Sequence, residues 1–124
     1  SVLNDHRPHT MIAVSAVCAD TTEEARRLAS SSELFFLQLS KGYPLAHFPS
    51  VETALAFPYE PYDLDMMSAR RRDAIAGTPA EVRERLLALR EQYDADELMI
   101  ASMVHDFDAR LRSFRLIAEA LRGD

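Results

Sequence analysis

The sequence contains a single cysteine, Cys18, so the chain cannot form an internal disulfide bond. It has no run of about 18 apolar residues and no cleavable signal pattern, which argues against a membrane protein or a secreted protein and predicts a cytoplasmic one. Basic residues are in the minority, with 14 Lys and Arg against 20 Asp and Glu. Because nucleic acids and anionic membranes normally require a basic face, we expect neither as a partner.

What the chain does contain is enough apolar material for one core. Its 124 residues are 48% hydrophobic, and we predict a single domain over residues 1–124. Three consecutive arginines, Arg70, Arg71 and Arg72, are followed at once by Asp73. A short charged run of this kind is typical of a solvated surface, so we assign it no function.

The first half of the chain predicts a strand followed by a helix. Residues 11–19 are almost continuously apolar, as in a parallel strand that is covered on both faces. Asp20 or Thr21 then offers an N-cap oxygen with a glutamate three residues later, which indicates the start of a helix. Gly42 is a plausible end for this helix.

Prolines interrupt the pattern in the middle of the chain. Residues 43–64 contain Pro44, Pro49, Pro58 and Pro61 with scattered aromatic residues, and we predict an irregular excursion there that serves as a lid or an interface arm. A short helix is expected over 65–73 and a brief extended piece over 74–76.

The last third has the clearest signals. Thr78, Pro79 and Glu81 form a capping-box pattern that predicts a helix start. An apolar strand is expected over 97–101, and Asp106 is expected to cap a final helix. The predicted buried faces of the two helices comprise Val82, Leu86, Leu89 and Tyr93 in the first, and Phe107, Leu111, Phe114, Ala118 and Leu121 in the second.

This order of elements predicts an α/β fold with parallel strands and amphipathic helices. The units are those of a (β/α)8 (TIM) barrel, which usually needs roughly 250 residues, so the chain corresponds to part of one. Strand edges that normally pair with neighbours would be exposed in such a piece, and we therefore expect a homo-oligomer.

Several segments resemble one known family. Residues 77–82, 95–100, 105–106, 109–114 and 118–121 are similar to the C-terminal end of luciferase-like flavin-dependent monooxygenases, the bacterial luciferase superfamily. Residues 11–29 resemble the preceding barrel strand and helix. The resemblance implies a partial TIM barrel, reduced flavin mononucleotide (FMN) and dioxygen as cosubstrates, oxidation of an organic substrate, and a separate flavin reductase as partner.

Functional groups in barrels lie at the carboxyl ends of strands and in the loops that follow. After the strand at 97–101 this rule indicates Ser102 and Met103 as cofactor contacts and His105 as the catalytic candidate, since it has the only side chain among the residues that follow the strands that titrates near neutral pH. The alternative is that His105 merely assists the start of the last helix.

Other candidates have simpler interpretations. Cys18 could be a nucleophile but is more readily a buried structural thiol. His6 and His9 have a metal-ligand spacing that Pro8 disrupts, so no metal site is predicted. The helix start at Thr78 could hold an anion, although a plain cap explains the same residues.

Two functions follow from the sequence. The first is a flavin-dependent monooxygenase of which this chain lacks the full active site. The alternative is a non-catalytic α/β fragment that acts through self-association or by completing a barrel.

Overall fold

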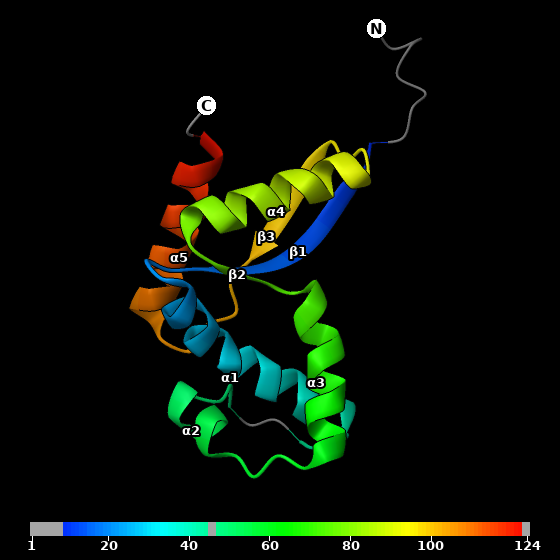
Figure 1. The fold of residues 1–124 in the computed structure, drawn as a ribbon, viewed down its shortest axis with the longest axis vertical. Helices are drawn as coiled ribbons and strands as arrows, with labels where there is room; N and C mark the ends of the chain where they lie inside the picture. Colours follow the sequence, from blue (N-terminus) through cyan, green and yellow to red (C-terminus); the bar gives the residue numbers. More distant parts are fainter. Residues whose placement is uncertain (1–8, 45–46, 123–124) are drawn as a thin grey trace, which may run out of the picture.

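The computed structural model of the chain describes residues 9–44 and 47–122 (Figure 1). Within these ranges strands and helices alternate along much of the chain. In chain order they are β1 (Met11–Cys18), α1 (Thr22–Ser40), α2 (Val51–Ala56), α3 (Pro61–Asp73), β2 (Ile75–Gly77), α4 (Pro79–Gln92), β3 (Glu97–Ala101) and α5 (Phe107–Arg122).

The three strands form one parallel sheet with the order β2-β1-β3. Residues 11–15 of β1 pair with β3, whereas residues 16–18 pair with β2. Strand β1 therefore uses one edge for β3 up to Ser15 and the opposite edge for β2 from Ala16. The predicted α/β fold with parallel strands is confirmed, and β2 is only a short addition to the end of β1.

Alternate residues of β1 pack into two different hydrophobic clusters, one on each face of the sheet. Ala16 and Cys18 pack with Val82 and Leu86 of α4 and Ile117 of α5, so these two helices cover one face of the sheet. On the other side Val17 and Ala19 join a cluster formed largely by α1. Figure 1 shows α4 and α5 beside the strands and α1 to α3 below them.

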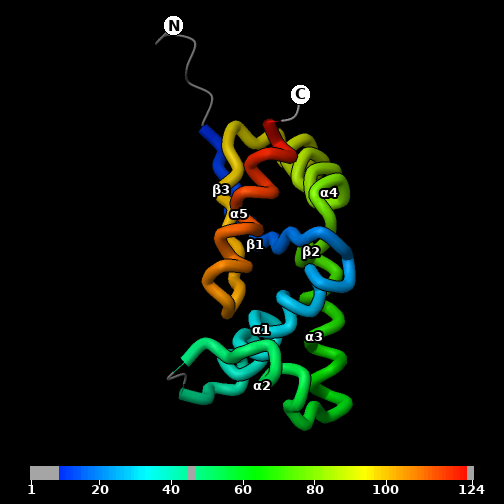
Figure 2. The backbone as a smooth tube through the Cα atoms, turned by 90° about the vertical axis from the view of Figure 1, so that its left-hand side faces the viewer, coloured from blue at the N-terminus to red at the C-terminus, as the bar shows by residue number. Residues whose placement is uncertain are grey.

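The face opposite α4 and α5 is bare over the first half of the sheet. The exposed alternate positions are Met11, Ala13 and Ser15 in β1, and Glu97, Met99 and Ala101 in β3. Met99 is 57% exposed although it is apolar. Figure 2 shows why, since α1, α2 and α3 lie beyond the carboxyl ends of the strands rather than against this face.

Glu81 connects the starts of two helices. Its Oε1 accepts hydrogen bonds from the Thr78 N–H at 2.9 Å and from the Thr22 hydroxyl at 2.7 Å, which confirms the predicted cap. The hydrogen bond from Thr78, and then that from Thr22, holds the pKa of Glu81 below its usual value. Gly77 leaves room for this carboxylate, because a Cβ there would lie 2.5 Å from Oε1.

The prediction that 43–64 is irregular is wrong over two stretches. Helix α2 forms within it, capped by Ser50, whose hydroxyl accepts from the Thr53 N–H at 3.1 Å. Helix α3 starts inside it at Pro61, because proline suits the first helical turn, where its missing N–H is not needed. Proline there marks a helix start rather than an interruption.

Helices α1 and α3 are held together by charge as well as by apolar contacts. The buried Asp63 carboxylate lies 2.6 Å from Lys41 Nζ and accepts the Glu60 N–H at 2.9 Å. The backbone hydrogen bond and then the lysine lower the pKa of Asp63. Arg71 donates two hydrogen bonds to Glu33, at 2.8 and 2.9 Å. These contacts fix the orientation of α3 on α1.

Two predicted buried faces need correction. In α5, Phe107 is 66% exposed and Leu111 is 46% exposed, while Ser113 and Ile117 are buried instead. The helix is turned toward Ser113 because that side chain accepts a hydrogen bond from the Cys18 N–H. In α4, Val82 and Leu86 are buried as predicted, but Tyr93 at the C-cap is 55% exposed.

Ser31 provides a test of packing within α1. Its side chain is fully buried, and its hydroxyl has no hydrogen-bond partner among the described residues. Because an unsatisfied buried hydroxyl is destabilising, we expect Ser31→Ala to raise the free energy of unfolding by about 1 kcal/mol in urea denaturation. The matched control is Ser30→Ala, whose exposed hydroxyl bonds only within its own helix. Equal effects of the two substitutions would contradict the burial argument.

Candidate functional site

A pocket of about 380 Å³ lies where β3 ends and α5 begins. It brings together all three residues predicted from the sequence, Ser102, Met103 and His105. The three residues line the same pocket because they lie in one loop, between β3 and α5. The remaining lining residues are Phe48, Ala101, Val104, Arg110 and Phe114.

Ser102 lines this pocket, but its hydroxyl is already engaged. It donates to the Ala16 carbonyl at 2.6 Å and lies 2.9 Å from the Ser113 hydroxyl. Since the single hydroxyl proton of Ser102 is donated to the Ala16 carbonyl, Ser113 must be the donor in the second bond. Ser113 in turn accepts the Cys18 N–H at 2.8 Å. The two hydroxyls therefore form a closed, satisfied network that fastens the β3 end and α5 to β1.

His105 is exposed at the rim of the pocket. The start of α5 beside it is held by Asp106, whose Oδ2 accepts the Ala109 N–H at 2.9 Å. The cap predicted at Asp106 is thus confirmed, and it occupies Asp106 rather than the imidazole. A role for His105 in binding or proton transfer stays a prediction, as do the cofactor contacts of Ser102 and Met103.

The sequence analysis missed Arg110, Phe114 and Phe48. The Arg110 guanidinium lies 6.0 Å from the centroid of the Phe114 ring. These two residues are four positions apart on a helix that starts just after His105, a spacing that could have indicated them. Phe48 comes from the middle segment and has no such signal. With them the pocket combines aromatic surfaces with a cation, which suits a planar anionic ligand.

Cys18 is a structural residue in this fold. It is buried beneath α4 and α5, and burial, followed by the nearby Asp20 carboxylate, raises the pKa of its thiol to about 11. Arg112 opposes this shift and is itself bonded to Asp20 at 2.7 Å. The thiol interpretation is confirmed. Across residues 9–44 and 47–122, no group of three or more His, Cys, Asp or Glu residues is placed to hold a metal ion.

Comparison with known proteins identifies relatives over nearly the whole chain. No protein-family model matches. The uncharacterized protein YwcH of Bacillus subtilis is 39% identical over 120 residues, which cover 97% of this chain and 36% of that protein. A luciferase-like monooxygenase of Escherichia coli is 29% identical over 122 residues, covering 94% of this chain and 36% of that protein.

The fold of the chain is also similar to that of a solved structure. The crystal structure of apo-MsnO8 has a TM-score of 0.76 at 32% identity and covers 93% of this chain and 35% of that one. The chain thus spans about a third of the length of the relatives it matches. The chain is similar to a segment of about that length in a luciferase-like monooxygenase. No helix in the described ranges is long and apolar enough to cross a membrane.

The pKa of Cys18 predicts its reactivity. We expect iodoacetamide to label the folded chain at pH 8 at least a hundredfold more slowly than the urea-unfolded chain, because the buried thiol stays protonated until about pH 11. Mass spectrometry of the alkylated peptide measures both rates. Labelling of the folded chain at the unfolded rate would contradict the buried position of Cys18.

Proposed function

We propose that the chain is the C-terminal part of a luciferase-like flavin-dependent monooxygenase, which uses reduced FMN and dioxygen to oxidise an organic substrate. The observation that carries the proposal is the pocket at the carboxyl end of β3, where Ser102, Met103 and His105 meet. Parallel α/β folds place their sites at this end of the sheet. The similarity to luciferase-like monooxygenases covers the segment that builds it.

The bare face of the sheet supports a partial TIM barrel over residues 1–124, forming one domain, whereas the strand order β2-β1-β3 differs from the chain order of barrel strands. Strands β1 and β3 are parallel neighbours over five residue pairs. Helices α4 and α5 cover one face of the pair, and the opposite face is bare. Two neighbouring barrel strands have this appearance, with helices outside and an inner face that the other strands of the barrel enclose.

The residues of the pocket fit a flavin. Met103, Phe48 and Phe114 offer an apolar and aromatic surface for a planar ring, and Arg110 supplies a positive charge for a phosphate. None of the lining residues is acidic, so nothing in the lining repels an anion. Because the Ser102 hydroxyl is engaged, Ser102 would contact the cofactor through its backbone. When bound, reduced flavin supplies the electrons that dioxygen chemistry requires.

The chain's own contribution to the reaction is a proton carrier and a partly apolar wall. The exposed His105 imidazole at the rim of the pocket would accept or donate the proton. Met103 and the aromatic residues form its apolar wall. A separate reductase, a cytoplasmic location and a homo-oligomeric state belong to this proposal.

A second candidate is a non-catalytic α/β fragment that acts by self-association or by completing a partner's barrel. The open edges of the sheet favour it. Strand β3 pairs with β1 alone in the described sheet, and residues 11–15 of β1 pair only with β3. Unpaired edges beside exposed apolar residues such as Met99 favour pairing with another chain.

Titration of FMN into the chain, followed by flavin fluorescence quenching, tests the first candidate. We expect saturable binding in the micromolar range. Met103→Ala should weaken it about fivefold, the effect of losing roughly 1 kcal/mol of apolar contact. Met66→Ala is the matched control, since Met66 lies outside this pocket.

Light scattering on the same samples separates the candidates. An oligomer of the folded chain that does not bind FMN would overturn the flavin proposal for this chain and support the second candidate. Saturable binding that Met66→Ala weakens as much as Met103→Ala would place the flavin elsewhere.

A further inference from the structure

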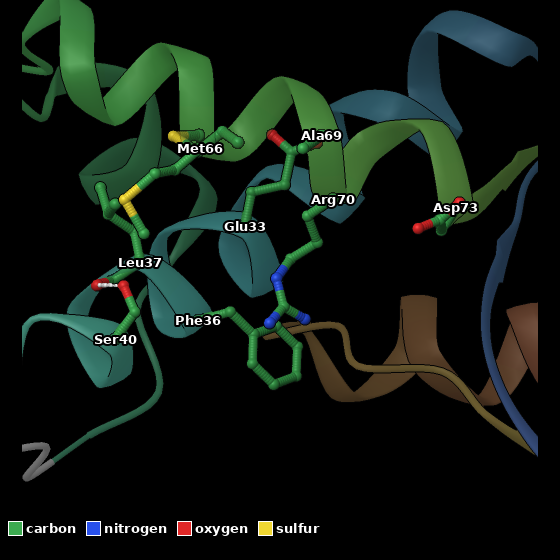
Figure 3. Close-up of a pocket in the computed structure, with 9 residues that line it drawn as sticks. Glu33, Phe36, Leu37, Ser40, Met66, Ala69, Arg70 and Asp73 are labelled. Carbon is green, nitrogen blue, oxygen red and sulfur yellow. Dashed lines mark hydrogen bonds between the residues drawn. The ribbon is translucent and has the colours of Figure 1, made fainter.

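A second recess lies between α1 and α3 and extends to residues 12–15 of β1 and to Leu89 of α4. It consists of two adjoining cavities of about 550 and 310 Å³ that share Glu33, Phe36, Arg70 and Asp73. Figure 3 shows the larger one, lined by Phe36 and Leu37 from α1 and by Met66 and Arg70 from α3. We call the two together the α1–α3 groove. It shares no lining residue with the β3 pocket.

One half of the α1–α3 groove is apolar and adaptable. Leu37, Met66, Met67 and the Phe36 ring line it, and the Ser40 hydroxyl there is bonded to the Leu37 carbonyl at 2.7 Å. Methionine side chains are flexible and polarisable, so they adjust their conformation to pack against an aliphatic chain better than branched side chains do. This half therefore suits a flexible apolar chain.

Arg70 stands at the middle of the groove, since it lines both cavities. Its guanidinium lies 4.3 Å from the centroid of the Phe36 ring. Unlike Arg71, which is bonded twice to Glu33, it has no ion pair with any residue of the described ranges. Stacking on a ring leaves the N–H edge of a guanidinium free to donate to a carboxylate. The groove thus presents a cation without a counterion beside an apolar wall.

Two acidic residues also line the groove, and both leave room for an anion. Glu33 is neutralised by Arg71 and is mostly buried. Asp73 follows Arg70 by three positions on α3, and Figure 3 places it on the side of Arg70 away from Met66. An anion that enters along Met66 therefore meets Arg70 before it meets Asp73.

We propose that the α1–α3 groove binds an aliphatic carboxylate, with the carboxylate on Arg70 and the chain over Met66 and Met67. Charge complementarity selects this occupant, because the unpaired cation lies directly beside the apolar half. A neutral or cationic chain would leave Arg70 without a partner. The site is separate from the β3 pocket and does not depend on the flavin proposal.

Octanoate is a suitable probe, and the methionine methyl groups are suitable reporters. The chain has five methionines, of which Met66 and Met67 lie in the groove and Met103 in the β3 pocket. In NMR spectra of chain labelled with ¹³C at the methionine methyls, octanoate should shift the Met66 and Met67 signals saturably. Octanol and octylammonium should bind at least fivefold more weakly.

Two substitutions of opposite sign sharpen the test. Arg70→Gln should weaken octanoate binding at least fivefold, whereas Asp73→Asn should strengthen it about twofold by removing a repulsion. Arg72→Gln is the matched control, since Arg72 lies on the same helix outside both cavities. The amide spectrum of each variant establishes that it is folded, and Asp73→Asn supplies the test if Arg70→Gln does not fold.

Three results would overturn the proposal. One is octanoate shifts confined to Met103, Met99 or Met11, which would place the ligand elsewhere. Another is equal affinity for octanol and octanoate with no effect of Arg70→Gln or Asp73→Asn, which would remove the role of charge. The third is the absence of any saturable shift, which would show that the groove is a surface depression only.

Discussion

Strand β1 lies between β2 and β3, and the end of its pairing with β3 at Ser15 constrains the whole carboxyl end of the sheet. Beyond this point β3 no longer supplies backbone partners to β1. Ser102 and Ser113 take over, bonding the Ala16 carbonyl and the Cys18 N–H. Since buried backbone groups need partners, the two hydroxyls fix where β3 ends and how α5 is rotated.

The rest of the site follows from that constraint. With Ser113 turned inward, Arg110 and Phe114 line the pocket beside His105. Arg112, from the same helix, bonds to Asp20 just after β1, and Glu81 joins α4 to Thr22 at the start of α1. These side-chain contacts connect the sheet layer to α1, on which α3 and the second groove are built. The protein thus presents two recesses with different lining residues, the β3 pocket and the α1–α3 groove.

Local signals in the sequence predicted the elements well. The cap of Thr78 with Glu81 and the apolar runs of β1 and β3 depend on neighbouring residues, so they could be read without tertiary knowledge. The buried face of α5 could not be predicted in this way. Apolar periodicity predicts burial of Phe107 and Leu111, whereas a hydrogen bond to β1 buries Ser113 instead. A serine that is buried because its hydroxyl forms hydrogen bonds does not contribute to the pattern of apolar residues in the sequence.

The candidate site divides in the same way. Ser102, Met103 and His105 could be predicted together because one loop after one strand carries all three. Phe48 could not, since it reaches the pocket from a segment that proline content made look irregular. Arg70 was interpreted as part of a solvated run, and only the packing of α3 on α1 shows that its guanidinium stacks on Phe36.

A double-mutant cycle of Ser102→Ala and Ser113→Ala, followed by urea denaturation, tests the central role of the serine pair most directly. Each single substitution should lower the free energy of unfolding by about 1 to 3 kcal/mol, because each leaves buried groups of β1 without a partner. The two effects should be non-additive by more than about 0.5 kcal/mol, as expected for residues in one network. Additive losses close to zero would contradict the account, since the end of β1 would then need neither hydroxyl.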